Sequence, residues 1–359
     1  MFDFVIIGGG IIGLLTAKEL QESGASVAVI EKNSPGQQAS WAAGGILSPM
    51  RPWHYSDAVN AISSISQTVY QELSNELFNE TGIDPEWLLA GMLVLHDEET
   101  PDALTWCKQQ NDSYELLSVE QLSNTFNHLK PINEAALLRP AVATIRPHKL
   151  LAALRAFLVK HGVTFIEQEA KHLVTPNQQI NGVQLESDIV KGGEYILCAG
   201  AWTPQLLREN ITVDIQPVKG QMICFPPIEL PNHCMVMDGN RYIIPRKDGR
   251  IVVGSTRENT GFDASTTPQA FKELRDFAQA LYPALQNIEP DAHWAGLRPS
   301  SPNSIPYICR VAPFTNLSLN AGHYRNGIVT APASAQLMAD IVLNRTYRIN
   351  PTPYQLTRS

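Results

Sequence analysis

One arginine of this sequence stands in a setting that suits ligand binding. Arg298 lies in the stretch AGLRPSSPNSIP, residues 295–306, between an apolar, glycine-containing approach and a polar segment interrupted by prolines. A guanidinium meets a planar carboxylate with two parallel N–H donors, and Pro299 restricts the backbone that aims them. The stretch therefore predicts an arginine that grips a carboxylate. The structural alternative is an ion pair at the surface or between domains.

A second group of residues has the spacing of a dinucleotide site. Gly8, Gly10 and Gly13 form the pattern G-x-G-x-x-G, and Glu31 ends the next apolar segment. The first glycine allows a tight turn, the second lets a pyrophosphate approach the backbone, and the third lets helix and strand pack closely. The helix N-terminus stabilises the phosphate charge, and Glu31 binds the adenosine ribose while repelling a 2′-phosphate. NADP is therefore disfavoured, and a turn without a ligand is the structural alternative.

The segment after this first unit bears on the choice of dinucleotide. Residues 36–49, GQQASWAAGGILSP, are mostly small and do not form another regular α/β unit. Small residues let the backbone run close against an extended ligand, which favours a flavin dinucleotide that reaches through the domain. The pattern alone does not decide between FAD and NAD.

Hydrophobic periodicity predicts the α/β elements that must hold these residues. Residues 2–32 predict a strand, a glycine turn, a helix that ends at Gly24 and a second strand. Residues 150–168 predict a helix that ends at Gly162, followed by a strand. Residues 194–207 and 317–345 each predict a strand, a glycine turn and a helix.

Other segments have the character of an antiparallel sheet. Residues 91–97 and 217–227 predict strands, and residues 241–256 predict a hairpin that turns at Lys247-Asp248-Gly249. Ser118 and Gln121 have the spacing of a capping box. We therefore expect an α/β fold in which a Rossmann-like dinucleotide-binding domain is interleaved with an α+β substrate domain built on an antiparallel sheet. Residues 1–85, 146–212 and 292–359 are assigned to the first domain, and residues 86–145 and 213–291 to the second.

Composition narrows the class of protein. The 359 residues are 44% apolar and 17% charged, which is typical of a globular protein, and the net charge of −8 without a Lys/Arg run argues against a nucleic-acid partner. Five cysteines without a C-x-x-C pair indicate buried or free thiols in a reducing compartment. Apolar runs are too short to span a bilayer, and the first one begins at Phe2, which leaves no room for a signal peptide. We expect a cytoplasmic protein without a membrane span.

Four separated stretches together resemble the D-amino-acid oxidase family of FAD-dependent oxidoreductases, and most of all its glycine oxidase branch. They are VIIGGGIIG with VIEK, ASWAAGGILSP, RYIIPRKDGRIVVGST, and AGLRPSSPNSIPYI with GHYRNGIVTAP. The stretches follow in the expected order and span nearly the whole chain. The resemblance implies that the dinucleotide is FAD and that the first domain is an FAD-binding domain.

The resemblance also implies which residues contact each part of FAD. Beside Gly8, Gly10 and Gly13, it implies Ile11 and Ile12 behind the glycine turn, Glu31 and Lys32 at the ribose, Ala170 at the adenine, and Gln38, Ala39, Ser40, Ala43, Gly44 and Gly45 along the pyrophosphate and flavin. At the pyrimidine end of the flavin it implies the turn formed by His323, Tyr324, Arg325, Asn326, Gly327, Ile328 and Val329. This turn opens the last helix, whose positive end would stabilise an anionic reduced flavin.

The substrate site implied by the resemblance consists of three residues. Arg298 would bind the substrate carboxylate, Tyr242 would support it through its hydroxyl, and Arg325 would line the site. From the residues alone, Tyr242 is explained equally well by packing on a strand, and Arg325 by bracing its turn. His323 is interpreted as a hydrogen-bonded structural histidine rather than an acid or base. No metal site is predicted.

Two positions depart from the pattern of the glycine oxidase branch. Asn240 stands where these enzymes often carry histidine, and Arg257 stands where an apolar residue is expected near the substrate side chain. If Arg257 points inward, it favours an anionic substrate side chain. We expect instead that it is a solvated charge of the hairpin. The choice of substrate is therefore open.

The reaction implied by the resemblance is oxidative deamination of glycine, a small D-amino acid or a sarcosine-like amine. Hydride transfer to flavin, hydrolysis of the imine and reoxidation by molecular oxygen would yield a keto acid, ammonia or an amine, and hydrogen peroxide. Such enzymes can serve thiamine biosynthesis. The alternatives are a D-amino acid dehydrogenase that passes electrons to a quinone, a tRNA-modifying amine oxidase domain, and a non-catalytic flavin-binding sensor or scaffold. The oligomeric state, including a homo-oligomer, is left open.

Overall fold

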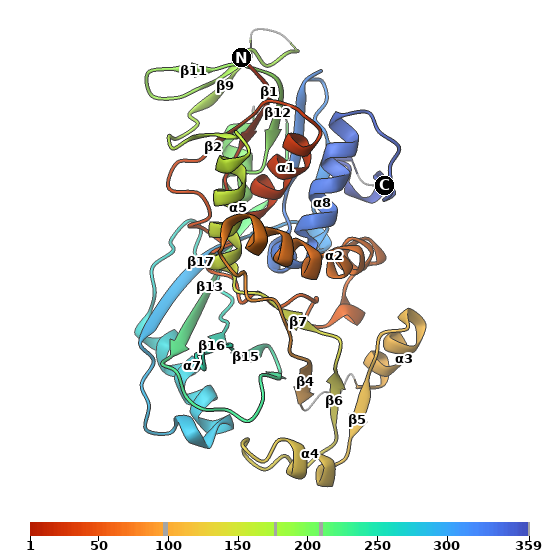
Figure 1. Cartoon of the computed structure of the whole chain (residues 1–359), viewed down its shortest axis with the longest axis vertical. Coiled ribbons are helices and arrows are strands. Elements are labelled where there is room, and N and C mark those ends of the chain that lie inside the picture. The colour runs from red at the N-terminus through yellow and green to blue at the C-terminus, as the bar shows by residue number, and fades with distance from the viewer. Residues whose placement is uncertain (96–99, 176–177, 208–210, 358–359) are drawn as a thin grey trace.

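Two large sheets, one above the other along the long axis of the molecule, organise the chain (Figure 1). The computed structural model describes residues 1–95, 100–175, 178–207 and 211–357. Both termini lie in the upper part, which contains a six-stranded sheet, and the lower part contains an eight-stranded sheet. The mixed α/β fold expected from the sequence is confirmed.

The six-stranded sheet is the predicted Rossmann-like element. Its strands, in the order β18-β19-β12-β1-β2-β8, are β18 (Tyr307–Arg310), β19 (Leu317–Ala321), β12 (Gly192–Leu197), β1 (Phe2–Ile7), β2 (Val27–Ile30) and β8 (Thr164–Ile166). Neighbouring strands run parallel except for the antiparallel pair β18–β19. Because parallel strands end at the same edge, the turns that follow β1, β12 and β19 meet there.

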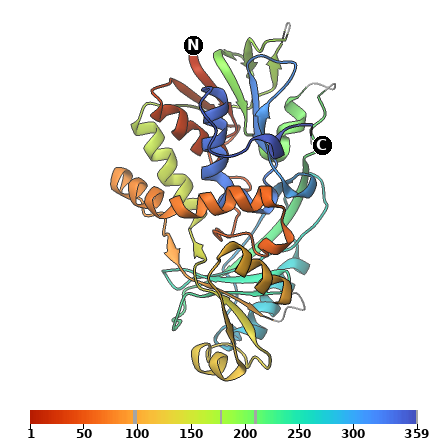
Figure 2. The ribbon, with the colours of Figure 1, turned by 90° about the vertical axis from the view of Figure 1, so that its right-hand side faces the viewer.

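Helices cover one face of this sheet (Figure 2). They are α1 (Ile11–Glu22), α5 (Pro147–Lys160) and α8 (Gly327–Val342), and α2 (Asp57–Thr81) packs across α5 and α8. The other face packs against a small sheet of β9 (His172–Val174), β10 (Gly182–Gln184) and β11 (Ile189–Val190). The long helix α2 was not predicted, since serines interrupt its buried stripe. Ser66 Oγ accepts a hydrogen bond from Ala333 N at 3.0 Å, so the stripe is packed although it is partly polar.

The eight-stranded sheet forms the core of the second part. Its order is β17-β13-β16-β15-β14-β4-β6-β5, with β17 (Ala292–Ser300), β13 (Gln216–Phe225), β16 (Ile251–Gly254), β15 (Arg241–Pro245), β14 (Met235–Asp238), β4 (Met92–Leu95), β6 (Ala136–Arg139) and β5 (Glu115–Leu117). The predicted antiparallel character holds except at β4–β14, which pair in parallel because the chain leaves this sheet between them. On one face, α4 (Val119–Thr125) and α7 (Pro268–Leu281) complete a hydrophobic core. The helix α3 (Thr100–Gln110) and the small pair β3 (Leu88–Leu89) and β7 (Ala143–Thr144) lie beside it.

Strand β17 corrects the sequence interpretation. The proline-interrupted stretch was placed in the first domain, yet residues 292–300 pair with β13 from Gln216↔Ser300 to Cys224↔Ala292. Because β17 is an edge strand, Pro299 is tolerated although it lacks a backbone donor. Residues 292–300 therefore belong to the second sheet, and the other domain limits remain a proposal.

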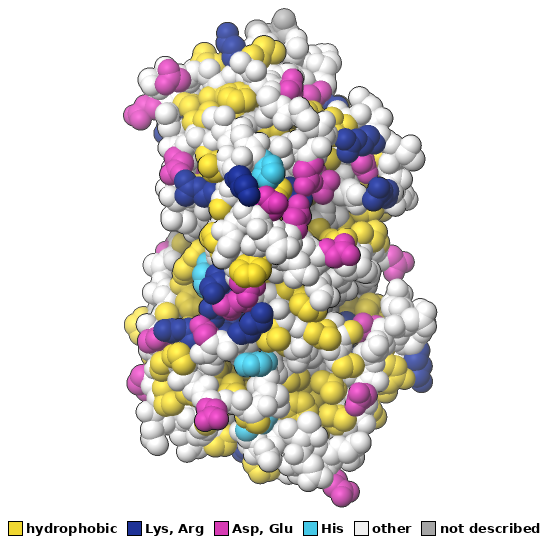
Figure 3. Space-filling model, viewed as in Figure 1, with side chains coloured by type: hydrophobic (Ala, Val, Ile, Leu, Met, Phe, Trp, Pro, Cys, Tyr) yellow, Lys and Arg dark blue, Asp and Glu magenta, His cyan; other side chains and the backbone are white. Residues whose placement is uncertain are grey.

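Several local predictions are confirmed. The hairpin is β15–β16, and the capping box joins Ser118 and Gln121 at the start of α4. The strand predicted at residues 91–97 is β4, although residues 96 and 97 lie outside the described part. All five cysteines are buried free thiols. Within the described residues, every helix is too short or too polar to cross a bilayer. On the face seen in Figure 3, Lys and Arg lie interspersed with Asp and Glu.

The packing of α1 on β1 predicts a severe effect of Gly13→Ala. A Cβ at Gly13 would lie 1.9 Å from Gly8 O, so the helix must move away from the turn. We expect a loss of stability of about 2 kcal/mol or more and a lower melting temperature. The control is Gly24→Ala: Gly24 has a φ of +87° but has no heavy atom within 4 Å of an added Cβ. It should cost about 1 kcal/mol. Equal losses in the two variants would contradict the steric argument.

Candidate active site

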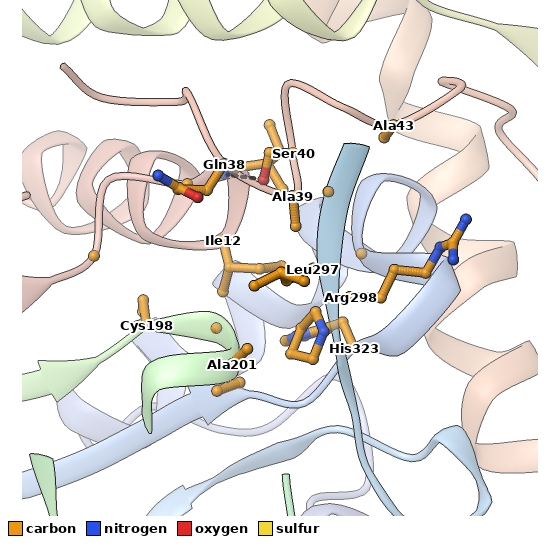
Figure 4. Close-up of a pocket in the computed structure, with 18 of the residues that line it drawn as sticks. Ile12, Gln38, Ala39, Ser40, Ala43, Cys198, Ala201, Leu297, Arg298 and His323 are labelled. Carbon is orange, nitrogen blue, oxygen red and sulfur yellow. Dashed lines mark hydrogen bonds between the residues drawn. The ribbon is translucent and has the colours of Figure 1, made fainter. Parts of the chain in front are cut away.

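A single elongated cavity collects the predicted residues where the two large sheets meet (Figure 4). Figure 4 shows it passing from Cys198 and Ala201, past Ile12, Leu297 and His323, to Arg298. The predicted residues that line it are Gly8, Gly10, Ile11, Ile12, Glu31, Lys32, Gln38, Ala39, Ser40, Ala43, Gly44, Gly45, Ala170, Tyr242, Arg298, His323, Tyr324, Arg325, Asn326, Gly327 and Ile328. Gly13 and Val329 are absent from the lining. Gly13 packs α1 against the turn, and Val329 is buried in α8.

The glycine turn forms the phosphate end of the cavity. Gly8 has a φ of +112°, and a Cβ there would lie 2.3 Å from Cys198 O, so only glycine lets the turns after β1 and β12 meet. The N-terminus of α1 follows directly, and Ile11 N donates to Ser40 Oγ at 3.0 Å. Glu31 accepts a hydrogen bond from Gly9 N at 2.8 Å. The turn therefore presents backbone, a helix N-terminus and a carboxylate to one ligand.

The turn after β12 supplies residues that sequence reasoning did not assign to the site. They are Cys198, Ala199, Gly200, Ala201, Trp202, Gln205 and Leu206. The signal was present, because a glycine turn after a second parallel strand must reach the same sheet edge as the first. Lys32 Nζ lies 3.7 Å from the centroid of the Trp202 ring. Other unassigned lining residues include Met50, Tyr55, Gly220 and Met222.

The small-residue segment is held in place by a buried arginine. Arg246 donates to Gly44 O at 2.6 Å, to Ile145 O at 3.1 Å and to Thr144 Oγ1 at 2.9 Å. Desolvation lowers the pKa of Arg246 to about 10, so the guanidinium remains a cation at neutral pH. Gly45 has a φ of +74°, and a Cβ there would lie 2.0 Å from Ile145 O. The segment thus runs against the cavity without side chains in the way.

Arg298 lines the far end of the cavity from strand β17. Its Nη2 donates to Ser255 Oγ at 2.8 Å, and its Nη1 donates to Thr256 O at 3.1 Å and to Lys219 O at 3.4 Å. Within the described part of the chain, no carboxylate forms an ion pair with it, so the structural alternative is not observed. Desolvation lowers its pKa, although an arginine stays charged at neutral pH. Arg298 is therefore a cation in the cavity wall without an acidic partner among the described residues, and it can bind an anionic ligand.

Tyr242 and Arg325 face the same end. The Tyr242 side chain is buried, its hydroxyl lies 3.8 Å from the Met222 sulfur, and its interaction with Arg298 acts to raise the arginine's pKa. Arg325 lines the same cavity, and its positive charge acts to lower that pKa. Two cations and a phenol in one cavity favour an anionic ligand.

Two further predictions concern His323 and Arg257, neither of which was expected to act as an acid or base or to bind the substrate. His323 is buried, and its Nε2 lies 3.2 Å from Ser334 Oγ, so it is the hydrogen-bonded structural histidine expected. Arg257 is exposed and is not among the lining residues, which agrees with a solvated hairpin charge.

The fold and the cavity define the class of this protein. A parallel sheet with a glycine turn, a ribose carboxylate and a long cavity that ends at a paired cationic site is typical of enzymes that bind a flavin dinucleotide. A family model described as FAD dependent oxidoreductase matches residues 3–341. The chain belongs to this family, and FAD is its cofactor.

Individual relatives agree with the family. A glycine oxidase of Pseudomonas aeruginosa is 40% identical over 98% of this chain and 97% of its own. A bifunctional protein ThiO/ThiG of Trichormus variabilis is 32% identical over 96% of this chain and 53% of its own. The crystal structure of glycine oxidase from Geobacillus kaustophilus has a TM-score of 0.94 and 26% identity, and covers 100% of this chain and 99% of its own.

The residues present fit FAD. Gly8, Gly44 and Gly45 line the cavity, and a Cβ at any of them would clash with the protein atoms packed behind it, so these positions offer only backbone to a ligand. The α1 N-terminus lies at the phosphate end, and the cavity continues to Arg298. That each lining residue contacts the cofactor stays a prediction.

The burial of His323 predicts a pH effect on stability. Desolvation lowers its pKa to about 3, whereas an unfolded histidine titrates near 6.5. Below about pH 6.5 the unfolded chain binds a proton that the folded chain does not, so the free energy of unfolding falls with decreasing pH until about pH 3. We compare His323→Gln, which keeps a hydrogen-bonding side chain beside Ser334. Between about pH 6.5 and 4.5 it should lose about 2 kcal/mol less than the unchanged protein in urea unfolding. Parallel losses would contradict the assignment.

Proposed function

We propose that this protein oxidises glycine, or a small D-amino acid or sarcosine-like amine, with FAD as cofactor and molecular oxygen as electron acceptor. The observation that carries the proposal is Arg298: a guanidinium that lines the cavity and has no acidic partner among the described residues. An amino-acid carboxylate is the small anion that matches its donors. The relatives named glycine oxidase support the choice of substrate.

The residues at the substrate end bind and orient rather than exchange protons. Arg298 and Tyr242 would hold the carboxylate, which fixes the direction of the α-carbon and its hydrogen. Among the lining residues described, the carboxylates are Glu31, which binds Gly9 N, and Glu169, which pairs with Lys171 at the nucleotide end. A strong side-chain base is therefore missing from this part of the cavity. This arrangement suits a substrate whose amine arrives neutral.

The chemistry and its products follow from that orientation. Bound FAD would supply the acceptor for the hydride of the substrate's C–H bond. The substrate becomes an imine, which water hydrolyses to glyoxylate and ammonia when the substrate is glycine. Oxygen consumption would yield hydrogen peroxide.

The walls near Arg298 support a small substrate. A Cβ on Gly44 would lie 2.9 Å from Ile244 Cδ1 and 3.2 Å from Tyr242 Cε2, so the small-residue segment packs directly on the tyrosine. The Met222 side chain packs at the same place, with its sulfur 3.8 Å from the tyrosine hydroxyl and its Cε 3.5 Å from a Cβ on Gly44. Space for a long substrate side chain is limited there.

The cellular setting is part of the proposal. The bifunctional ThiO/ThiG relative supports a place in thiamine biosynthesis, and the reduced thiols support the cytoplasm.

The test is an anaerobic spectrum of the purified yellow protein. Glycine, sarcosine and D-alanine are added in turn, and loss of flavin absorbance is expected with at least one of them. Admitting air should restore the colour with stoichiometric hydrogen peroxide, measured with an oxygen electrode and a peroxidase assay. Bleaching without peroxide, together with rapid reduction of a quinone, would identify a dehydrogenase. A spectrum that no amine or amino acid bleaches would leave a flavin-binding sensor or scaffold.

Arg298→Leu should remove the grip on the carboxylate. Loss of a bidentate charged interaction should raise the KM for the best substrate by about 100-fold or more, while FAD remains bound. Arg257→Leu is the matched control, because Arg257 is an exposed arginine outside the cavity, and its KM should stay unchanged. Steady-state kinetics and the flavin content of both variants are measured. Undiminished activity of Arg298→Leu would remove its proposed role.

A further inference from the structure

Gly220 lies directly beneath the guanidinium of Arg298. A Cβ at Gly220 would lie 2.0 Å from Nη2, 2.1 Å from Nη1 and 2.2 Å from Cζ of Arg298. The two residues are diagonal neighbours, since Arg298 pairs with Val218 and Gly220 pairs with Gly296 in the β13–β17 ladder. The guanidinium therefore occupies the volume that any side chain at position 220 would fill.

The backbone does not require glycine at this position. Gly220 is not among the glycines with positive φ, and it lies inside the extended strand β13, where other residues are accommodated. Glycine in a strand is unfavourable unless another group approaches the backbone closely. Here the approaching group is the arginine side chain.

The space over Gly220 is closed on its sides by hydrogen-bond acceptors. Lys219 O, Thr256 O and Ser255 Oγ each accept one hydrogen bond from the guanidinium. We call this arrangement of Gly220 with these three acceptors the guanidinium slot. A guanidinium has five N–H donors. These acceptors take two hydrogen bonds from Nη1 and one from Nη2, which leaves Nε and one N–H of Nη2 for other partners. The Tyr242 side chain also interacts with the guanidinium.

Further hydrogen bonds and ion pairs fix the residues that form the guanidinium slot. The Lys219 backbone exchanges hydrogen bonds with that of Glu258, at 2.9 and 3.0 Å. The buried Lys219 ammonium lies 3.3 Å from a Glu258 carboxylate oxygen and 3.4 Å from one of Asp263. Gln221 N donates to Thr256 Oγ1 at 2.9 Å. The acceptors that hold Arg298 are thus fixed relative to Gly220.

We propose that Gly220 is a positioning residue for the reaction, because the space over its Cα aims Arg298 so that Nε and Nη2 face the substrate carboxylate. This inference rests on the proposed function and deepens it by naming what sets the direction of the arginine. A methyl group at position 220 meets the far end of a long, flexible side chain. The strand can therefore tolerate it while the guanidinium is displaced.

Gly296 provides a matched comparison in the facing strand. Gly296 also lies opposite another glycine inside a strand, but a Cβ there would lie 2.6 Å from Ala42 Cβ. Trp294, two residues earlier on the same face, donates from its indole to Ala42 O at 3.1 Å. Gly296→Ala should therefore disturb the segment that runs along the cofactor, whereas Gly220→Ala should disturb Arg298.

The first experiment measures two affinities in the FAD-loaded and apo forms of the full chain. The probe for the carboxylate site is acetate, detected by the change it causes in the absorption spectrum of bound flavin, and FAD affinity is measured by fluorescence. Gly220→Ala should weaken acetate binding by about tenfold or more and leave the FAD Kd within about twofold. Its KM for the amine should rise more than its kcat falls. Gly296→Ala should show the opposite pattern, with weakened FAD. Unchanged acetate affinity in Gly220→Ala would overturn the proposal.

The second experiment needs no catalytic turnover. It distinguishes an effect of Gly220 on the position of Arg298 from an effect on the stability of strand β13. When Arg298 is present, Gly220→Ala should lower the melting temperature of the protein. In the Arg298→Ala background, where the slot is vacated, it should leave the melting temperature unchanged or raise it. Equal decreases in both backgrounds would show that Gly220 serves the strand alone, and would overturn the proposal. If no amine is oxidised but this coupling is found, the proposed function fails while the slot stands.

Discussion

A partly buried guanidinium without an acidic partner in the described chain is the constraint on which the cavity depends. Removing a cation from water is costly, and Arg298 recovers part of that cost from neutral acceptors alone. A carboxylate in place of those acceptors would have satisfied the charge internally. Because no carboxylate of the described chain neutralises the Arg298 charge, the cavity favours an anionic ligand. The positive charge of Arg325 strengthens this preference.

The two sheets supply different parts of the cavity. The six-stranded sheet brings the turns after β1, β12 and β19 to one edge, where the N-termini of α1 and α8 both reach the cavity. The eight-stranded sheet carries Arg298 on β17 and Tyr242 on β15, with β13 and β16 between these two strands. Strand β17 contributes to both ends of the cavity. Trp294 and Gly296 contact Ala42 in the small-residue segment, and Arg298 lines the end proposed for the substrate.

The parts of the fold that sequence could predict are those set by local spacing. The glycine turn, the β15–β16 hairpin, the capping box at Ser118 and the ends of α1 and α5 depend on residues close together in the chain. Helix α2 was missed because its buried stripe contains serines that hydrogen-bond to backbone. Strand β17 was misplaced because Pro299 suggests a loop, and only pairing with β13 shows that it is an edge strand.

The candidate site divides along the same line. The residues expected to face FAD were predicted largely through a resemblance carried by four stretches, and most of them line one cavity. The guanidinium slot was beyond sequence reasoning, because Gly220 and Arg298 lie 78 positions apart, and nothing in the stretch PVKGQM marks its glycine as empty space. Such a role appears only when the side chain that fills the space is known.

The order of strands in the six-stranded sheet also governs how the chain can be made. Its central strand β1 is synthesised first, yet its neighbour β12 ends near residue 197 and β19 near residue 321. On a ribosome, β1 and β2 are therefore made before residues 31–191, and β1 has an unpaired hydrophobic edge until β12 follows. In a nascent chain of this topology, the exposed edge of β1 is open to pairing with other chains until β12 is made, and the edge of β12 until β19 is made.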